Sequence, residues 1–267
     1  MEQFDRYLDE AHRLKMQYAS QITLLVGLET EFITQADLDN LDALLARVGD
    51  RIEYIVGSVH HVNGIPIDFD LATYYKSMRS LSGKTDQQAQ ELFLSVYFDA
   101  QYDLMRRFHP EIIGHIDLCR LYNPDLKLSS YPFAWQKLER NVLHAIEYGA
   151  LFEVNASAFR KKWATAYPGM DVVEVNSHFT TVFVFILNHL QLVLKHGGRF
   201  ALSDDSHGPN AVGLNYGPLA EYLKVAGVSE LWYLQKSDTQ NAAGRHIQPV
   251  RLGGKWSDSG FWHNKLS

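Results

Sequence analysis

Residues Gly57–Gly64 have the sequence Gly-Ser-Val-His-His-Val-Asn-Gly and directly follow the apolar run Ile52–Val56. A β-branched run that closes in this way predicts a buried strand, Ile52–Val59, which delivers His60 to its carboxyl end. Parallel α/β proteins hold their chemistry at the carboxyl ends of their strands. We therefore expect His60 to mark the functional edge of a parallel sheet, with His61 as a neighbour on the rim.

Four other stretches repeat this pattern of a short apolar run that closes on a polar or metal-binding residue. They lie in Ile22–Glu29, Ile112–Ile116, Leu151–Asn155 and Phe200–His207, and a sixth strand is expected at Glu230–Leu234. Helical periodicity separates the strands, most clearly in Gln35–Val48, Thr85–Phe108, Phe133–Tyr148, His178–His196 and Leu219–Val225. This alternation predicts the α/β class with a parallel sheet, built as a (β/α) barrel or as an open doubly wound sheet.

The composition indicates one globular domain that spans residues 1–267, with a less regular tail at 241–267. Hydrophobic residues make up 46% of the chain and the net charge is −6. An acidic chain without long Lys/Arg runs is not expected to bind nucleic acid. The apolar stretch Phe179–Leu194 is interrupted by polar residues, so it is expected to be a buried helix and not a membrane span. The single cysteine, Cys119, and the absence of a signal sequence indicate a cytoplasmic protein.

Residues that can bind a metal gather at the predicted strand ends. They are Glu29, His60, His115, Asp205 and His207, with Asn155 beside them. Oxygen and imidazole ligands of this kind suit Zn²⁺, Mn²⁺ or Fe. In Asp205-Ser206-His207 the first and third side chains point the same way if the backbone is extended. Glu31 is an alternative to Glu29 as the metal ligand, and Asp204 is an alternative to Asp205. A single strand-end histidine is more often structural, but five such residues on four strands favour a metal site.

In this order the motifs resemble those of the PHP (polymerase and histidinol phosphatase) metallohydrolases, and most closely the histidinol-phosphatases of histidine biosynthesis. The resemblance covers Phe4 to about Leu252. It rests on Gly27-Leu28-Glu29, Gly57–His60, Gly114–Leu118, Glu153–Asn155 and Ser203–His207, and further on Asp68, Arg120, Asn155–Arg160 and Tyr167-Pro168.

The resemblance implies a distorted (β/α)₇ TIM-like barrel with up to three divalent metal ions and no organic cofactor. Glu29 would bridge two metals, and His60 and His115 would complete the ligands of the second. Asp205 would bind the first metal and His207 the third, and both are the expected catalytic residues. Substrate-binding roles fall to Arg120, Asn155 and Arg160, because a guanidinium matches the oxygens of a phosphate.

One family feature is missing ahead of Glu29. The family begins with a His-x-His strand, whereas His12 is the only histidine before Glu29 here, and it lies on the polar side of a predicted amphipathic helix. We therefore expect a barrel that is incomplete at the N-terminus, with an open edge. Phosphatase activity is expected to be impaired, although about one divalent metal should still bind.

The expected activity is the metal-dependent hydrolysis of L-histidinol phosphate, a small-molecule phosphomonoester, to L-histidinol and phosphate. An inactive PHP-fold protein with a binding or regulatory role is the first alternative. Another PHP phosphoesterase, such as an exonuclease, is disfavoured by the acidic charge and by Asn155–Arg160. The third alternative is a truncated gene model, in which the reading frame of the real product starts further upstream. No membrane or nucleic-acid partner is expected, and the oligomeric state is left open.

Overall fold

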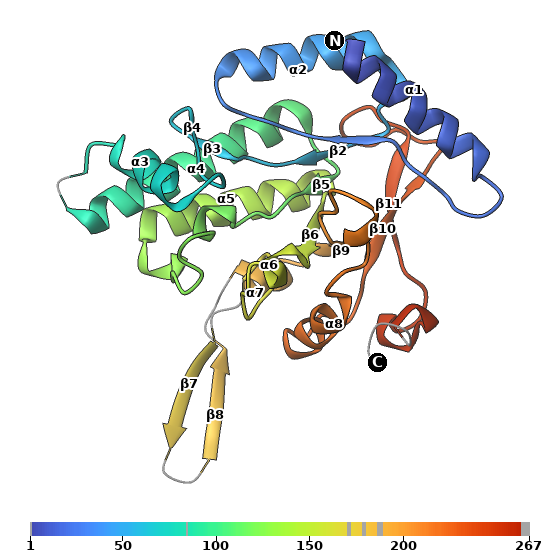
Figure 1. Ribbon diagram of the computed structural model, residues 1–267. Coiled ribbons are helices and arrows are strands. Elements are labelled where there is room, and N and C mark those ends of the chain that lie inside the picture. Colours follow the sequence, from blue (N-terminus) through green and yellow to red (C-terminus); the bar gives the residue numbers. More distant parts are fainter. Residues whose placement is uncertain (1, 84, 170–171, 178–179, 186–188, 263–267) are drawn as a thin grey trace.

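The centre of the molecule is a five-stranded parallel sheet (Figure 1). The structure is a computed structural model that describes residues 2–83, 85–169, 172–177, 180–185 and 189–262. The strand order is β1-β2-β5-β6-β9. These strands are β1 (Gly27–Glu29), β2 (Tyr54–Gly57), β5 (Ile112–Ile113), β6 (Leu151–Asn155) and β9 (Arg199–Ser203).

The strand order decides between the two predicted architectures. Neighbouring strands of this sheet follow one another along the chain, as they do in a barrel, whereas a doubly wound sheet reverses its order. The sheet is nevertheless open. Closure would need hydrogen bonds between its two outer strands, and in the described part of the chain β1 and β9 pair only with β2 and β6. The parallel α/β sheet is therefore confirmed, while a closed barrel is not formed by these residues.

The sixth predicted strand lies outside the central sheet. It forms β10 (Trp232–Lys236), which pairs antiparallel with β11 (Ile247–Arg251) in the segment that the sequence suggested to be a less regular tail. The first strand is also shorter than the predicted Ile22–Glu29, because only Gly27–Glu29 pairs with β2. At this outer edge the hydroxyl of Tyr7 donates to the carbonyl of Gly27 over 2.8 Å. A helix side chain thus occupies a position that a further strand would use.

Four long helices match their predicted positions, and their ends have local explanations. They are α1 (Glu2–Gln17), α2 (Gln35–Val48), α4 (Asp86–Phe108) and α5 (Pro132–Tyr148). Thr85 caps α4 by accepting the backbone N–H of Gln88. His109 and Gly149 end α4 and α5 in the left-handed conformation. Helices α4 and α5 pack together beside the sheet (Figure 1), and their apolar faces belong to the main core.

Shorter elements connect these parts. The helices are α3 (Leu71–Arg79), α6 (Ser157–Arg160) and α8 (Tyr216–Val225), and a small antiparallel pair consists of β3 (His61–Val62) and β4 (Ile65–Pro66). Single 3₁₀ turns occur at Gly49–Arg51, Leu118–Arg120, Leu128–Ser130, Pro209–Ala211, Trp256–Asp258 and Gly260–Trp262. No helix in the described residues is both long enough and apolar enough to cross a lipid bilayer.

The predicted helix His178–His196 is confirmed only in its last part. Val172–Ser177 (β7) and Thr180–Phe185 (β8) form an antiparallel pair, and only His189–Lys195 (α7) is helical. Positions 178–179 and 186–188 lie outside the described residues. The β8 sequence, Thr-Thr-Val-Phe-Val-Phe, consists of β-branched and aromatic residues that prefer strands. Apolar content alone did not distinguish a buried helix from a strand here.

Candidate metal centre

Three of the predicted metal ligands meet at the carboxyl edge of the sheet. Glu29 ends β1, His60 follows β2 and His115 follows β5, and their ligand atoms lie within 4.8 Å of one another. The Nε2 atoms of His115 and His60 lie 3.1 and 3.4 Å from the same oxygen, Oε1 of Glu29. The two rings meet edge to face with centroids 5.0 Å apart. We call these three residues the Glu29 cluster.

Backbone contacts hold the strand ends of the cluster in register. Thr30 donates its hydroxyl to the carbonyl of Ser58 over 2.9 Å and accepts the N–H of Ser58 over 2.8 Å. Glu153, buried on β6, accepts the backbone N–H of His115 over 2.7 Å. Gly114 must be a glycine, since a Cβ there would lie 2.3 Å from the hydroxyl oxygen of Ser58. The cluster therefore rests on hydrogen bonds that join four neighbouring strands.

The structure separates the roles of Glu29 and Glu31, which the sequence left open. Glu29 faces the Nε2 atoms of both histidines. Glu31 faces the other side of His60, with its Oε2 3.4 Å from Nδ1, and its Oε1 lies 2.8 Å from Nδ1 of His61. A carboxylate on the outer ring nitrogen of a ligand histidine orients that ring. A supporting role of Glu31 and His61 beside the cluster is therefore a prediction, which the sequence did not make.

The charges within the cluster shift the pKa values of its members. Burial raises the pKa of Glu29, but hydrogen bonds with His115 and His60 outweigh it and hold this pKa well below its usual range. Burial lowers the pKa of His60, but Glu29 and Glu31 outweigh it and raise this pKa to about 10. Burial also raises the pKa of Glu31, but the contacts with His60 and His61 outweigh it and lower this pKa. Without a metal, a proton on His60 therefore offsets part of the negative charge of Glu29 and Glu31.

The donor set of the cluster fits a divalent transition metal. One carboxylate and two imidazoles are the protein ligands found at open catalytic zinc sites, where a further position stays available. The negative charge of Glu29 and Glu31, which favours a proton on His60, would also favour a bound cation. The Glu29 side chain is 42% exposed, so the centre is accessible from solvent.

Asp205 and His207 do not join this cluster. They lie on the loop that follows β9, and within the described residues only Glu29, His60 and His115 form a metal-ligand group. Asp205 has a φ of 50°, in the left-handed region, so the extended backbone that would align the two side chains is not present. His207 is 84% exposed, and its Nδ1 contacts the carbonyl of Asp205 over 3.0 Å. Their roles as metal ligands and catalytic residues remain predictions.

Asp204 organises the same loop. One of its carboxylate oxygens accepts the Ser206 hydroxyl and the other accepts the backbone N–H of Gly213. Arg160, at the end of α6, donates to the carbonyl of Asp205 over 3.0 Å and is otherwise exposed. The loop after β9 and the end of α6 therefore lie side by side.

The remaining predicted substrate ligands lie in the interior. Arg120 is 1% exposed, and its Nη2 forms an ion pair with the buried carboxylate of Asp117 over 3.0 Å. Its Nη1 donates to the carbonyls of Pro124 and Leu126. Asn155 is buried and accepts the N–H of Ser157. Both side chains thus have structural partners here, and their contact with substrate remains a prediction.

Comparisons with known proteins identify the family of this chain. The family profile of the PHP domain matches residues 1–157. A Schizosaccharomyces pombe protein named "Probable histidinol-phosphatase" is 39% identical over 257 residues, which cover 95% of this chain and 76% of that protein. The histidinol-phosphatase of Saccharomyces cerevisiae is 30% identical over 264 residues, which cover 88% of this chain and 72% of that enzyme.

A solved structure shares the fold. The histidinol phosphate phosphatase of Lactococcus lactis, crystallised with zinc, L-histidinol and phosphate, superposes with a TM-score of 0.57 at 17% identity. The match covers 86% of this chain and 76% of that one. The chain therefore belongs to the PHP domain family. Its sequence identity to the two fungal proteins places it in the histidinol-phosphatase branch of that family.

Proposed function

We propose that this chain hydrolyses L-histidinol phosphate to L-histidinol and phosphate with the help of a bound divalent metal, such as Zn²⁺, Mn²⁺ or Fe²⁺. The observation that carries the proposal is the 39% identity to the S. pombe protein over 95% of the chain. The Glu29 cluster supports it, because phosphomonoester hydrolysis by PHP-type enzymes depends on metal and the cluster offers a suitable set of donors.

The residues of the chain have distinct parts in this proposal. Glu29, His60 and His115 would hold the metal, and Glu31 orients His60 through its outer ring nitrogen. When bound, the metal supplies Lewis-acid chemistry at the phosphoryl group and lowers the pKa of water. Arg160 offers positive charge at the same edge of the sheet, which would balance the charge on the phosphate oxygens.

Asp205 and His207 belong to the proposal as catalytic residues that also bind metal. Ser203, at the end of β9, pairs in register with Asn155 of β6, so the loop that carries them leaves the sheet at its carboxyl edge. Arg120 and Asn155 complete the proposed substrate site. A distorted (β/α)₇ barrel of the PHP type that is incomplete at the N-terminus is part of the same proposal, and the chain-order succession of the five parallel strands supports it.

Phosphate release from L-histidinol phosphate, with Mn²⁺ or Zn²⁺ added, tests the proposal directly. We expect release that requires metal, stops on chelation and is faster than release from O-phospho-L-serine, which lacks the imidazole. Equal rates on both substrates would indicate a different phosphoesterase. Metal binding without release would instead support the inactive, binding form of the fold.

A further inference from the structure

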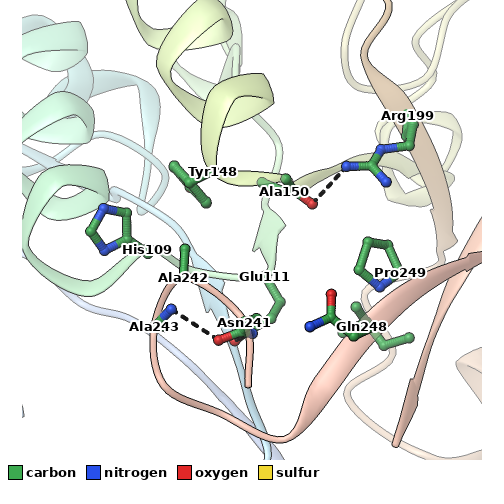
Figure 2. Close-up of a pocket in the computed structure, with 12 residues that line it drawn as sticks. His109, Glu111, Tyr148, Ala150, Arg199, Asn241, Ala242, Ala243, Gln248 and Pro249 are labelled. Carbon is green, nitrogen blue, oxygen red and sulfur yellow. Dashed lines mark hydrogen bonds between the residues drawn. The ribbon is translucent and has the colours of Figure 1, made fainter. Parts of the chain in front are cut away.

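A cavity lies at the edge of the sheet opposite the Glu29 cluster, and Figure 2 shows the residues that line it. Its volume is about 170 Å³. Glu111 precedes β5, Ala150 precedes β6 and Arg199 begins β9, so the cavity is formed at the amino ends of three neighbouring strands. Residues 241–243 and the start of β11 close its other side.

Polar side chains around this cavity have unused hydrogen-bonding groups. The hydroxyl of Tyr148 is buried and has no partner among the described residues. Arg199 donates from Nη2 to the carbonyl of Gly149 over 3.2 Å and lies over the ring of Trp232, 4.9 Å from its centroid. Within the described chain no carboxylate lies within ion-pair distance of Arg199. Figure 2 places Tyr148, Arg199 and Gln248 around the same space.

The carboxylate that lines this cavity, Glu111, already has partners inside the fold. Glu111 accepts Nε of Arg245 over 2.6 Å and Nδ2 of Asn241 over 2.5 Å with one oxygen, and the N–H of Ile55 over 2.9 Å with the other. The positive charge of Arg199 is therefore left without a counter-charge at the cavity. Burial lowers the pKa of Arg199, because its charged form has lost part of its hydration. An anion beside the guanidinium would compensate for that loss.

We propose that this cavity binds a small organic monocarboxylate, whose oxygens pair with the guanidinium of Arg199 and accept the hydroxyl of Tyr148. A planar carboxylate matches the fork of a guanidinium, and Arg199 lies over the ring of Trp232. A single uncompensated positive charge favours a monoanion over a dianion such as inorganic phosphate. The rim amide of Gln248 would contact the remainder of the ligand. The Glu29 cluster plays no part in this binding.

Calorimetric titration of the whole chain with acetate, propionate and butyrate tests the proposal, with sodium chloride replacing each salt at the same ionic strength. We expect saturable binding of at least one carboxylate and much weaker binding of inorganic phosphate. Arg199→Gln should reduce the affinity about tenfold or more, since it removes a charged hydrogen-bond donor. Tyr148→Phe keeps the ring that packs on His109, removes only the hydroxyl and should cause a smaller loss.

Arg251→Gln is the matched control, because Arg251 is an exposed arginine on β11 and the substitution changes the net charge equally. This variant should bind as the unaltered chain does. Heats equal to those of chloride, or equal affinities in Arg199→Gln and Arg251→Gln, would overturn the proposal. Should Arg199→Gln not fold, an unchanged affinity in Tyr148→Phe would overturn it as well. Phosphate binding as tight as that of the carboxylates would refute the proposed ligand class.

Discussion

The two halves of the predicted metal site differ in how the fold supports them. Glu29, His60 and His115 come from three adjacent strands and share one carboxylate oxygen, whereas Asp205 and His207 lie on the loop after β9. The two histidines also differ in side-chain exposure, because His115 is 7% exposed and His207 is 84% exposed.

This difference shows what parallel strands can and cannot position. The end of a paired strand is fixed by its neighbours. Glu29 at the end of β1 and the histidines that follow β2 and β5 therefore lie close together. His60, His115 and Asp205 all lie two or three residues past the end of a strand, since β2 ends at Gly57, β5 at Ile113 and β9 at Ser203. The difference lies in the backbone, because Asp205 has a left-handed φ of 50° that redirects the chain after β9. The sheet alone therefore does not determine where Asp205 and His207 lie.

Replacing one ligand from each half gives the largest expected contrast. His115→Ala should lower phosphatase activity about a thousandfold, because it removes a ligand of the proposed metal centre. His207→Ala should cost about tenfold, the effect of losing one exposed contributor. Rates and metal content of both variants, measured side by side, check this. Equal losses in the two variants would show that the loop half is as important as the Glu29 cluster.

Arg120 and Arg160, the two arginines of the predicted phosphate site, differ in their expected contribution to the free energy of unfolding. Asp117→Ala removes the buried ion pair with Arg120 and should lower the free energy of unfolding by about 3 kcal/mol. Arg160→Ala changes an exposed side chain and should lie within about 0.5 kcal/mol of the unaltered chain. Urea unfolding of both variants measures the difference. A small effect of Asp117→Ala would mean that the pair has no structural importance.

The contact of Glu31 with His60 tests the strand-end half of the site, which consists of Glu29, His60 and His115. Its expected effect is smaller. Glu31→Gln should weaken zinc binding about 10- to 100-fold, since the carboxylate that orients His60 is lost. Competition with a chromophoric chelator gives the affinity. Glu10→Gln, an exposed change of the same chemistry on α1, serves as the control. Unchanged affinity in Glu31→Gln would assign the orientation of His60 to packing alone.

The pH dependence of the metal-free chain is a further test of the strand-end half of the site. The pKa of His60 is raised from 6.5 to about 10, so its contribution to stability is complete below pH 6.5 and is lost as pH rises through 10. Unfolding by urea with a chelator present, at several pH values across this window, should show a decline that His60→Gln abolishes. An identical decline in that variant would assign it to other groups.

Local signals predicted the helices of this fold better than its β-structure. The limits of α2, α4 and α5 follow from residues such as Thr85 and Gly149, whose effects act within a few positions. Thr180–Phe185 was predicted as helix from its apolar content, although its β-branched and aromatic residues favour a strand. The strand β11, which pairs with β10 across the intervening residues 237–246, was missed because the sequence indicated a less regular tail at 241–267.

The sequence by itself determined the family and the α/β class, because short apolar runs and the residues that close them are local features, and it named Glu29, His60 and His115 as candidate ligands. Only the tertiary structure showed that Glu29, and not Glu31, faces the Nε2 atoms of both histidines. The tertiary structure likewise left the sheet open, separated Asp205 and His207 from the cluster and buried Arg120 against Asp117. It also revealed the cavity at Arg199, whose walls come from segments that the chain brings together only when folded. Contacts between distant segments depend on the path of the whole backbone, and a local pattern does not specify that path.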